Sequence, residues 1–107
     1  MAVPEISVQE LKRRLDAGEP LQLIDVREPW ECEIVALPQA RQIPLQQLPN
    51  RLQELSKEGE VVAMCKSGGR SRRAAEFLQS AGFPQVTNVT GGIQAWIDEI
   101  DPTLPGY

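Results

Sequence analysis

Hydrophobic residues along the chain gather in short, mostly apolar runs that alternate with segments of helical spacing. Three runs have the length of buried strands, at residues 21–26, 60–64 and 85–89. Apolar runs of about four to eight residues are typical of strands that are covered on both faces, as in a parallel sheet. Residues 42–43 form a shorter candidate strand, which a proline ends. The alternation predicts an α/β fold in which helices flank a mostly parallel sheet.

The first helix is predicted from a capping box, SVQE at residues 7–10. In such a box the serine hydroxyl accepts the backbone N–H of the glutamate, and the glutamate carboxylate reaches back to the serine. We expect this helix to run from about residue 8 to residue 17 and to stop at Gly18.

Three further segments show helical spacing. Pro49 is expected to open a second helix at its first position, with one apolar stripe formed by Leu48, Leu52 and Leu55. A third helix is expected to end at Gly82, and a short fourth one to follow Gly91-Gly92. The apolar residues of these last two helices are Ala74, Ala75, Phe77 and Leu78, then Ile93, Trp96 and Ile97, with Trp96 in the core. The proline-rich tail at residues 101–107 is predicted to be non-helical and to pack along the surface.

Composition limits the architecture and the partners. A chain of 107 residues with 41% hydrophobic and 24% charged residues has the normal make-up of one compact domain, so we expect residues 1–107 to form a single domain. The start of the chain lacks a basic flank followed by an apolar core, and no apolar run of about 18 residues occurs, which predicts a cytoplasmic protein that does not bind membranes. The formal net charge of −4 argues against nucleic-acid binding, because acidic residues repel the phosphate backbone.

The chain has two cysteines and no histidine. Cys32 and Cys65 do not form a CxxC pair, so the usual zinc ligand sets cannot be assembled, and we expect neither a metal nor another cofactor. A disulfide is not expected in a reducing compartment. Cys32 is predicted to be a small buried residue, with a resolving thiol as the alternative.

Residues 64–71, MCKSGGRS, place Cys65 where a strand passes through a glycine-rich loop into a helix. Backbone N–H groups of such a loop and the N-terminus of the next helix converge on one point. A thiolate there is stabilised without a histidine, and the cations Lys66, Arg70, Arg72 and Arg73 are expected to add to the effect. The sequence therefore predicts that Cys65 is a catalytic nucleophile. The alternative is a buried cysteine at a strand end beside an ordinary turn.

Charged residues near this loop have two interpretations each. Arg70 either binds a substrate anion or pairs with Asp25, Glu28 or Glu33 and so fixes the loop, and we favour the pairing. Asp25 and Arg27, at the end of a strand, are expected to support neighbouring loops by hydrogen bonds rather than to catalyse. The arginines at 72 and 73 are expected to be solvated and to steer anions toward the loop.

Four ordered motifs resemble the rhodanese-like sulfurtransferases. They are LIDVREP at residues 23–29, Ile43-Pro44, CKSGGRS at residues 65–71 and GGIQAW at residues 91–96. The segment from residue 96 to 107 is similar to the end of the rhodanese module in proteins that adenylate and sulfurate ubiquitin-like sulfur carriers. Where the family often shows Glu-x-Gly-His-Ile-Pro-Gly-Ala, this chain reads EIVALPQA, without the histidine and both glycines. The resemblance implies a five-stranded parallel core sheet flanked by helices.

The resemblance also implies a reaction, in which Cys65 takes a sulfane sulfur from thiosulfate or another persulfide donor and carries it as a persulfide. The implied acceptor is cyanide, a small thiol or a protein cysteine, and we expect the protein to be a monomer. Asp25 and Arg27 would support the site. The transferred sulfur and the donor anion would be bound by Lys66, Ser67, Gly68, Gly69, Arg70 and Ser71.

Two other functions stay open. A related fold serves phosphatases and arsenate reductases, whose cysteine loop has five residues between the cysteine and the arginine and usually a histidine before the cysteine. Here four residues separate Cys65 from Arg70, and Met64 precedes the cysteine. A smaller ring of amides suits one sulfur atom better than a phosphoryl group, so sulfur transfer is favoured. A non-enzymatic module for sulfur relay or docking is the second alternative.

Overall fold

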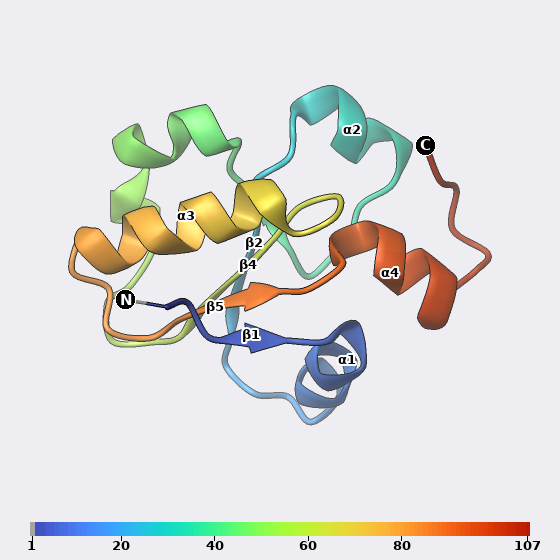
Figure 1. Cartoon of the computed structure of the whole chain (residues 1–107), viewed down its shortest axis with the longest axis horizontal. Helices are drawn as coiled ribbons and strands as arrows, with labels where there is room; N and C mark the ends of the chain where they lie inside the picture. The colour runs from blue at the N-terminus through green and yellow to red at the C-terminus, as the bar shows by residue number, and fades with distance from the viewer. Residues whose placement is uncertain (1) are drawn as a thin grey trace.

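A sheet of five parallel strands lies at the centre of the computed structural model, which describes residues 2–107 (Figure 1). In spatial order the strands are β1 (Glu5–Ile6), β5 (Val86–Val89), β4 (Val61–Met64), β2 (Gln22–Asp25) and β3 (Arg41–Gln42). Every pairing is parallel, as the sequence predicts. Because β4 is the middle strand, its carboxyl end lies at the centre of the row formed by the carboxyl ends of the five strands.

Side chains alternate across the strands and divide the apolar residues into two cores. Leu23, Val62 and Met64 face the core beneath α1 (Val8–Asp16) and α4 (Gly92–Glu99). The alternate residues of β2 and β4 belong to the core beneath α3 (Gly69–Ser80). Figure 1 shows α1 and α4 on one side of the sheet and α3 on the other. Both faces are therefore covered, which explains why the strands read as apolar runs.

The first, third and fourth predicted helices are confirmed. Ser7 caps α1 by accepting the Glu10 N–H at 3.1 Å, and α3 and α4 occupy the predicted segments. Trp96 lies in the core, as expected. The tail after residue 100 is non-helical and runs back toward α2 (Pro29–Ile34) in Figure 1.

The prediction of an α-helix opened by Pro49 is wrong. This segment forms two short 3₁₀-helices, η1 (Leu45–Asn50) and η2 (Leu52–Glu54). Pro49 lies inside η1, where it has no N–H to donate. The backbone then leaves helical geometry at Arg51, with φ of −126° and ψ of 18°. The leucines have helical spacing, but they lie in and next to two short 3₁₀-helices and not in one α-helix.

Two elements were not predicted from the sequence. β1 has only two residues, too few for a period to be visible. α2 has a start pattern that could have been recognised, because Pro29 stands at its first turn and Glu28 and Glu31 form a capping box. Within residues 2–107, no helix is both long enough and apolar enough to cross a bilayer.

Candidate active site

The cysteine loop begins at the carboxyl end of β4 and ends in the first turn of α3. Cys65 follows the last strand residue directly and is only 1% exposed within the core beneath α3. Gly68 has a φ of 112°, a left-handed conformation that lets the chain turn into the helix at Gly69. The strand before the loop and the helix after it thus hold Cys65 in place from both ends of the loop.

The sulfur of Cys65 lies within hydrogen-bond distance of groups from the loop and the helix. The Gly68 N–H donates to Sγ at 3.0 Å, and the Ser71 hydroxyl lies 3.3 Å from Sγ. Burial by itself raises the pKa of this thiol, but the Ser71 hydroxyl and the backbone N–H groups of Ser71, Gly68 and Ser67 outweigh it and leave the pKa below its ordinary value. The cysteine is therefore buried, as the structural alternative holds, and yet surrounded by groups that favour the thiolate.

The N-terminus of α4 holds the loop from its other side. The N–H groups of Ile93 and Gln94 donate to the carbonyl oxygens of Cys65 and Lys66 at 2.9 and 3.0 Å. Those carbonyls therefore point away from the sulfur, which leaves the N–H groups of the loop to face it. A Cβ atom at Gly92 would lie 2.3 Å from the Cys65 carbonyl oxygen, so this approach requires glycine. The Gly91-Gly92 motif at the start of α4 thus supports the cysteine loop by close packing against its backbone.

Arg70 forms a two-pronged ion pair with a glutamate of α2. Its Nη1 and Nη2 donate to Oε1 and Oε2 of Glu31 at 2.6 and 2.9 Å. The sequence led us to expect pairing with Asp25, Glu28 or Glu33, so the partner was predicted wrongly. The cause is α2, whose unpredicted helical turn directs Glu31 inward and leaves it 3% exposed.

A family model described as Rhodanese-like domain matches residues 7–99. The protein belongs to the rhodanese-like family. At the level of the family it is a rhodanese-like sulfurtransferase, which agrees with the four motifs and with the α/β sheet. Among solved structures it is similar to a rhodanese-like domain protein from Staphylococcus aureus, with 31% identity and a TM-score of 0.85 over 98% of this chain and 99% of that one. It also resembles a human single-domain sulfurtransferase, with 27% identity and a TM-score of 0.83 over 92% and 98% of the two chains.

Curated relatives include both short and long proteins. The chain is 41% identical to "Putative sulfurtransferase YtwF" of Bacillus subtilis over 95% of its own length and 98% of that protein. It is 43% identical to "Rhodanese-like/PpiC domain-containing protein 12, chloroplastic" of Arabidopsis thaliana over 98% of its length, but spans only 38% of that protein. It is 35% identical to "Adenylyltransferase and sulfurtransferase MOCS3-2" of Zea mays and spans 23% of it. The similarity to rhodanese modules of adenylating proteins is therefore confirmed.

Asp25 and Arg27 of this rhodanese-like domain form a completely buried ion pair at the end of β2. Nε and Nη2 of Arg27 donate to the Asp25 carboxylate at 2.7 to 3.1 Å. Arg27 also donates to the backbone carbonyls of Glu31 and Val35 at 3.4 and 2.8 Å. The pair therefore ties β2 to α2 and holds the segment that carries Glu31. Neither side chain contacts the sulfur of Cys65.

The tail brings Tyr107 against the same cluster. Its hydroxyl accepts from Nη1 of Arg27 at 2.9 Å and donates to Oε2 of Glu31 at 2.7 Å. Nζ of Lys66 donates to the Tyr107 carbonyl and lies 4.4 Å from the centre of its ring. Trp30, which is 59% exposed, meets the ring edge-on at 5.8 Å. No feature of the sequence indicates that the tail reaches the cysteine loop, because no local pattern pairs residues so far apart.

The four cations near the loop, which were expected to add to the stabilisation of the thiolate, differ in their surroundings. Arg70 faces Glu31 and Lys66 faces Tyr107, so both are engaged by neighbouring groups. Arg72 lies 4.0 Å from Glu5 of β1, and Arg73 is exposed to solvent. None of the four donates a hydrogen bond to Sγ among the described contacts, where the donors are Gly68 and Ser71. The hydroxyl and amides act on the sulfur directly, and the cations act from farther away.

Cys32 lies in α2 and is buried, as the sequence predicts. Its sulfur is 3.8 Å from Oδ2 of Asp25. Burial, and then the nearby carboxylate, raise the pKa of Cys32 to about 11. This thiol is therefore much less reactive than that of Cys65. Both cysteines are free.

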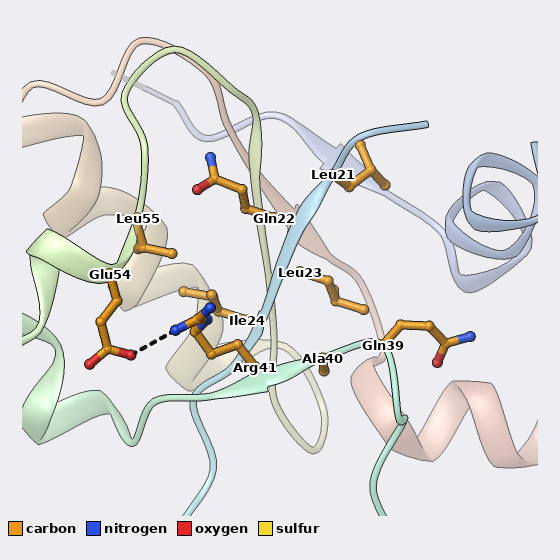
Figure 2. A pocket seen from close by; sticks show the side chains of 9 residues that line it. All are labelled: Leu21, Gln22, Leu23, Ile24, Gln39, Ala40, Arg41, Glu54 and Leu55. Carbon is orange, nitrogen blue, oxygen red and sulfur yellow. Dashed lines mark hydrogen bonds and ion pairs between the residues drawn. The ribbon is translucent and has the colours of Figure 1, made fainter. Parts of the chain in front are cut away.

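Two surface hollows differ in their relation to the loop. One of about 530 Å³ lies at the free edge of the sheet, beside β3, where Arg41 pairs with Glu54 at 3.1 Å (Figure 2). Its lining contains no cysteine or serine. A smaller hollow of about 260 Å³ adjoins the cysteine loop and is lined in part by Ser67, Gly68 and Asn88. The smaller hollow thus adjoins the backbone of the cysteine loop, although Cys65 itself does not line it.

Proposed function

We propose that the protein is a thiosulfate sulfurtransferase that carries the transferred sulfur on Cys65. The observation that supports this most is the Cys65 sulfur itself, which receives the Gly68 N–H at 3.0 Å and has the Ser71 hydroxyl at 3.3 Å. These donors stabilise a sulfur anion without a histidine, and the depressed pKa of Cys65 follows from them.

The proposed reaction has two displacement steps. The Cys65 thiolate attacks the outer sulfur of thiosulfate, a new S–S bond forms, the S–S bond of thiosulfate breaks, and sulfite leaves with its electron pair. In the second step cyanide or a thiolate attacks the outer sulfur of the Cys65 persulfide. The bond to Sγ breaks, and Cys65 is returned as a thiolate. Each step needs an anionic sulfur at the same place, which is what the loop donors favour.

The charges around the loop support an anionic donor. Lys66 lies in the loop, Arg70 lies in the first turn of α3, and Arg72 and Arg73 follow on that helix. Such cations raise the local concentration of a dianion and so its rate of encounter, an effect that salt weakens. A thiol of another protein is a further acceptor, because the second step needs only an accessible thiolate.

Intact mass spectrometry after incubation with thiosulfate tests the proposal. We expect the wild-type protein to gain the mass of one sulfur atom and to lose it when cyanide is added. Cys65→Ser should gain no sulfur and should lose thiosulfate:cyanide transfer by at least about a thousandfold, because the nucleophile is gone. Cys32→Ser is the matched control and should behave as wild type. Sulfur loading of the Cys65→Ser protein, or none in the wild type, would contradict the assignment.

A further inference from the structure

Asn88 is a buried polar residue of the sheet, on the face that α3 covers. It belongs to β5, is 1% exposed and occupies a position two residues after Val86, which packs in the core beneath α3. Burying an amide is costly unless each of its polar atoms finds a partner. An apolar side chain would pack there without this cost, so the hydrogen bonds of Asn88 must offset it.

The contacts of Asn88 fix the direction of its amide. Nδ2 lies 3.1 Å from a carboxylate oxygen of Glu5 and 3.2 Å from the carbonyl oxygen of Gly68. Both of these groups only accept hydrogen bonds, so the NH₂ group must face them. The amide oxygen Oδ1 then faces Ser71, whose Oγ lies 2.6 Å away. A carbonyl oxygen cannot donate, so Ser71 must donate to Asn88.

Ser71 has one hydroxyl hydrogen and more than one acceptor within reach. Its Oγ lies 2.6 Å from Asn88 Oδ1, 3.2 Å from the Gly68 carbonyl oxygen and 3.3 Å from Cys65 Sγ, and the residue is fully buried. When Cys65 is a thiol, the S–H can donate to Oγ while the hydroxyl donates to Asn88. When Cys65 is a thiolate, it has no hydrogen to give, and Oγ can only help by turning its hydrogen toward the sulfur.

We propose that Asn88 is a positioning residue that holds the Ser71 hydrogen bond while the sulfur is neutral and releases it to the sulfur when the sulfur becomes an anion. Asn88 and Cys65 thus compete for one hydrogen. The proposal builds on Cys65 being the nucleophile of the proposed function, and it adds a residue of β5 to the site. Asn88 does not touch the sulfur and acts through Ser71.

A consequence follows for the reactivity of the resting cysteine. The Ser71 hydroxyl can stabilise the Cys65 thiolate only when the Ser71–Asn88 bond is given up, so Asn88 opposes ionisation, whereas Ser71 supports it. Removing the amide oxygen takes away the nearest acceptor of Ser71 and leaves the Gly68 carbonyl and Sγ, so the hydroxyl should donate to Sγ more often. The Cys65 thiolate should then become more populated, and the residue should react faster with an alkylating agent below its pKa.

Other charged groups around Cys65 must be held constant for this comparison. Arg70 of α3 is paired with Glu31 of α2, and Lys66 of the loop is held by Tyr107. Asp25 and Arg27 of β2 form a closed buried pair, and Glu5 of β1 faces Asn88 and Arg72. The titratable or charged groups that face the loop are therefore Arg70, Glu31, Lys66, Tyr107, Asp25, Arg27, Glu5 and Arg72.

The test measures the rate of Cys65 alkylation by iodoacetamide against pH, by peptide mass analysis, and needs no sulfur donor. Asn88→Leu replaces the amide by an apolar group of similar shape. We expect alkylation below the thiol pKa to become about three- to tenfold faster, the equivalent of one neutral hydrogen bond. In a Ser71→Ala background the same substitution should change the rate by less than about twofold, because the effect passes through the hydroxyl.

A merely structural role for Asn88 gives a different result. Asn88→Leu would then disturb the loop by removing the bonds to Gly68 and Glu5. The change in alkylation rate would be the same in the native background and in the Ser71→Ala background. Equal acceleration in both backgrounds, or no acceleration with the serine present, would overturn the proposal. Since this experiment does not use thiosulfate, its failure is distinct from failure of the proposed sulfur transfer.

A measurement on the unsubstituted chain covers the case in which Asn88→Leu does not fold. The side-chain ¹³Cγ resonance of Asn88, followed by NMR across the ionisation of Cys65, should shift as Oδ1 loses its hydrogen bond. In Ser71→Ala this shift should be largely absent. An Asn88 resonance that stays constant through the titration, or that shifts equally in Ser71→Ala, would rule the exchange out.

Discussion

Cys65 combines two properties that usually exclude each other, because a buried thiol normally resists ionisation. The residue is 1% exposed, and burial alone raises its pKa. Donors from Gly68 and Ser71 reverse this effect at distances of 3.0 and 3.3 Å. At the scale of one residue, reactivity therefore depends on where a few N–H and O–H groups point and not on how open the sulfur is to solvent.

The two cysteines should differ strongly in reactivity within one folded molecule. We expect iodoacetamide to label Cys65 with a pH profile whose midpoint lies below the ~8.5 of a free thiol. Cys32, whose pKa is raised to about 11 by burial, should be labelled at least about a hundredfold more slowly at neutral pH. Both should react at similar rates in urea, which is the control. Equal rates in the folded protein, or a Cys65 midpoint at the value of a free thiol, would be inconsistent with the loop donors.

At the scale of elements, the site is the meeting point of a strand end and two helix N-termini. β4 delivers Cys65, α3 begins at Gly69 and contributes Ser71, and α4 holds the loop carbonyls through its first N–H groups. Each of these is needed for the loop N–H groups to face inward. α2 adds Glu31, which holds the Arg70 side chain of α3 by an ion pair.

Gly92→Ala tests the contact between α4 and the loop. The added Cβ would lie 2.3 Å from the Cys65 carbonyl oxygen, at a residue with φ of 55°. We expect the free energy of unfolding in urea to fall by about 2–5 kcal/mol, from left-handed strain together with overpacking. Gly69→Ala is the matched control, because a Cβ there meets nothing within 4 Å. It should change stability by less than about 1 kcal/mol, and a comparable loss in both variants would dismiss the contact as the cause.

Loop length tests the choice between sulfur transfer and phosphoester hydrolysis. Four residues separate Cys65 from Arg70, so few N–H groups converge on the substrate. The wild-type protein should hydrolyse aryl phosphates no faster than Cys65→Ser does. Inserting one glycine between Gly68 and Gly69 should widen the loop and lower thiosulfate:cyanide transfer by at least about tenfold. Undiminished transfer in the insertion variant would remove loop size as an explanation, and strong wild-type phosphatase activity would reverse the proposed function.

At the scale of the molecule, Glu31 joins α2, α3 and the tail. The Arg70 guanidinium, with help from the Tyr107 hydroxyl, outweighs burial and lowers the pKa of Glu31 to about 2. The unfolded chain has the ordinary pKa of about 4.3, so the folded state binds this proton less readily. The stabilisation is therefore present above about pH 4.5 and is lost as pH falls toward about 2.

We expect the free energy of unfolding to decrease over this acid range, and to decrease less in Glu31→Gln. Glu54 is the matched control, because Arg51 lowers its pKa to about 2 as well, but the Glu54 side chain is 25% exposed against 4% for Glu31, so solvent screens its ion pair more. Glu54→Gln should alter the acid dependence less than Glu31→Gln does. Urea unfolding at several pH values measures both. An acid dependence that is the same in the wild type and in Glu31→Gln would show that the ion pair carries no stability.

The sequence allowed four of the strands, three helices and the cysteine loop to be predicted, because these depend on local patterns of apolar residues and glycines. The helix at Pro49 was predicted wrongly, since the leucines have the spacing of an α-helix but the segment is divided at Arg51 into two short 3₁₀-helices. Contacts between distant segments were not predictable in the same way. Glu31 as the partner of Arg70, Tyr107 at the loop and Asn88 beside Ser71 depend on how the elements pack, which no short stretch of sequence records.

The position of Tyr107 has a consequence for when the site comes into being during synthesis. Its hydroxyl bonds Arg27 across 80 residues and Glu31 across 76. Closing so long a stretch of chain costs more conformational entropy than forming a local contact. A nascent chain that has been made only as far as β5 has β4 and Cys65 but neither α4 nor the tail. The surroundings of the reactive cysteine are therefore complete only after Tyr107 has been added to the chain.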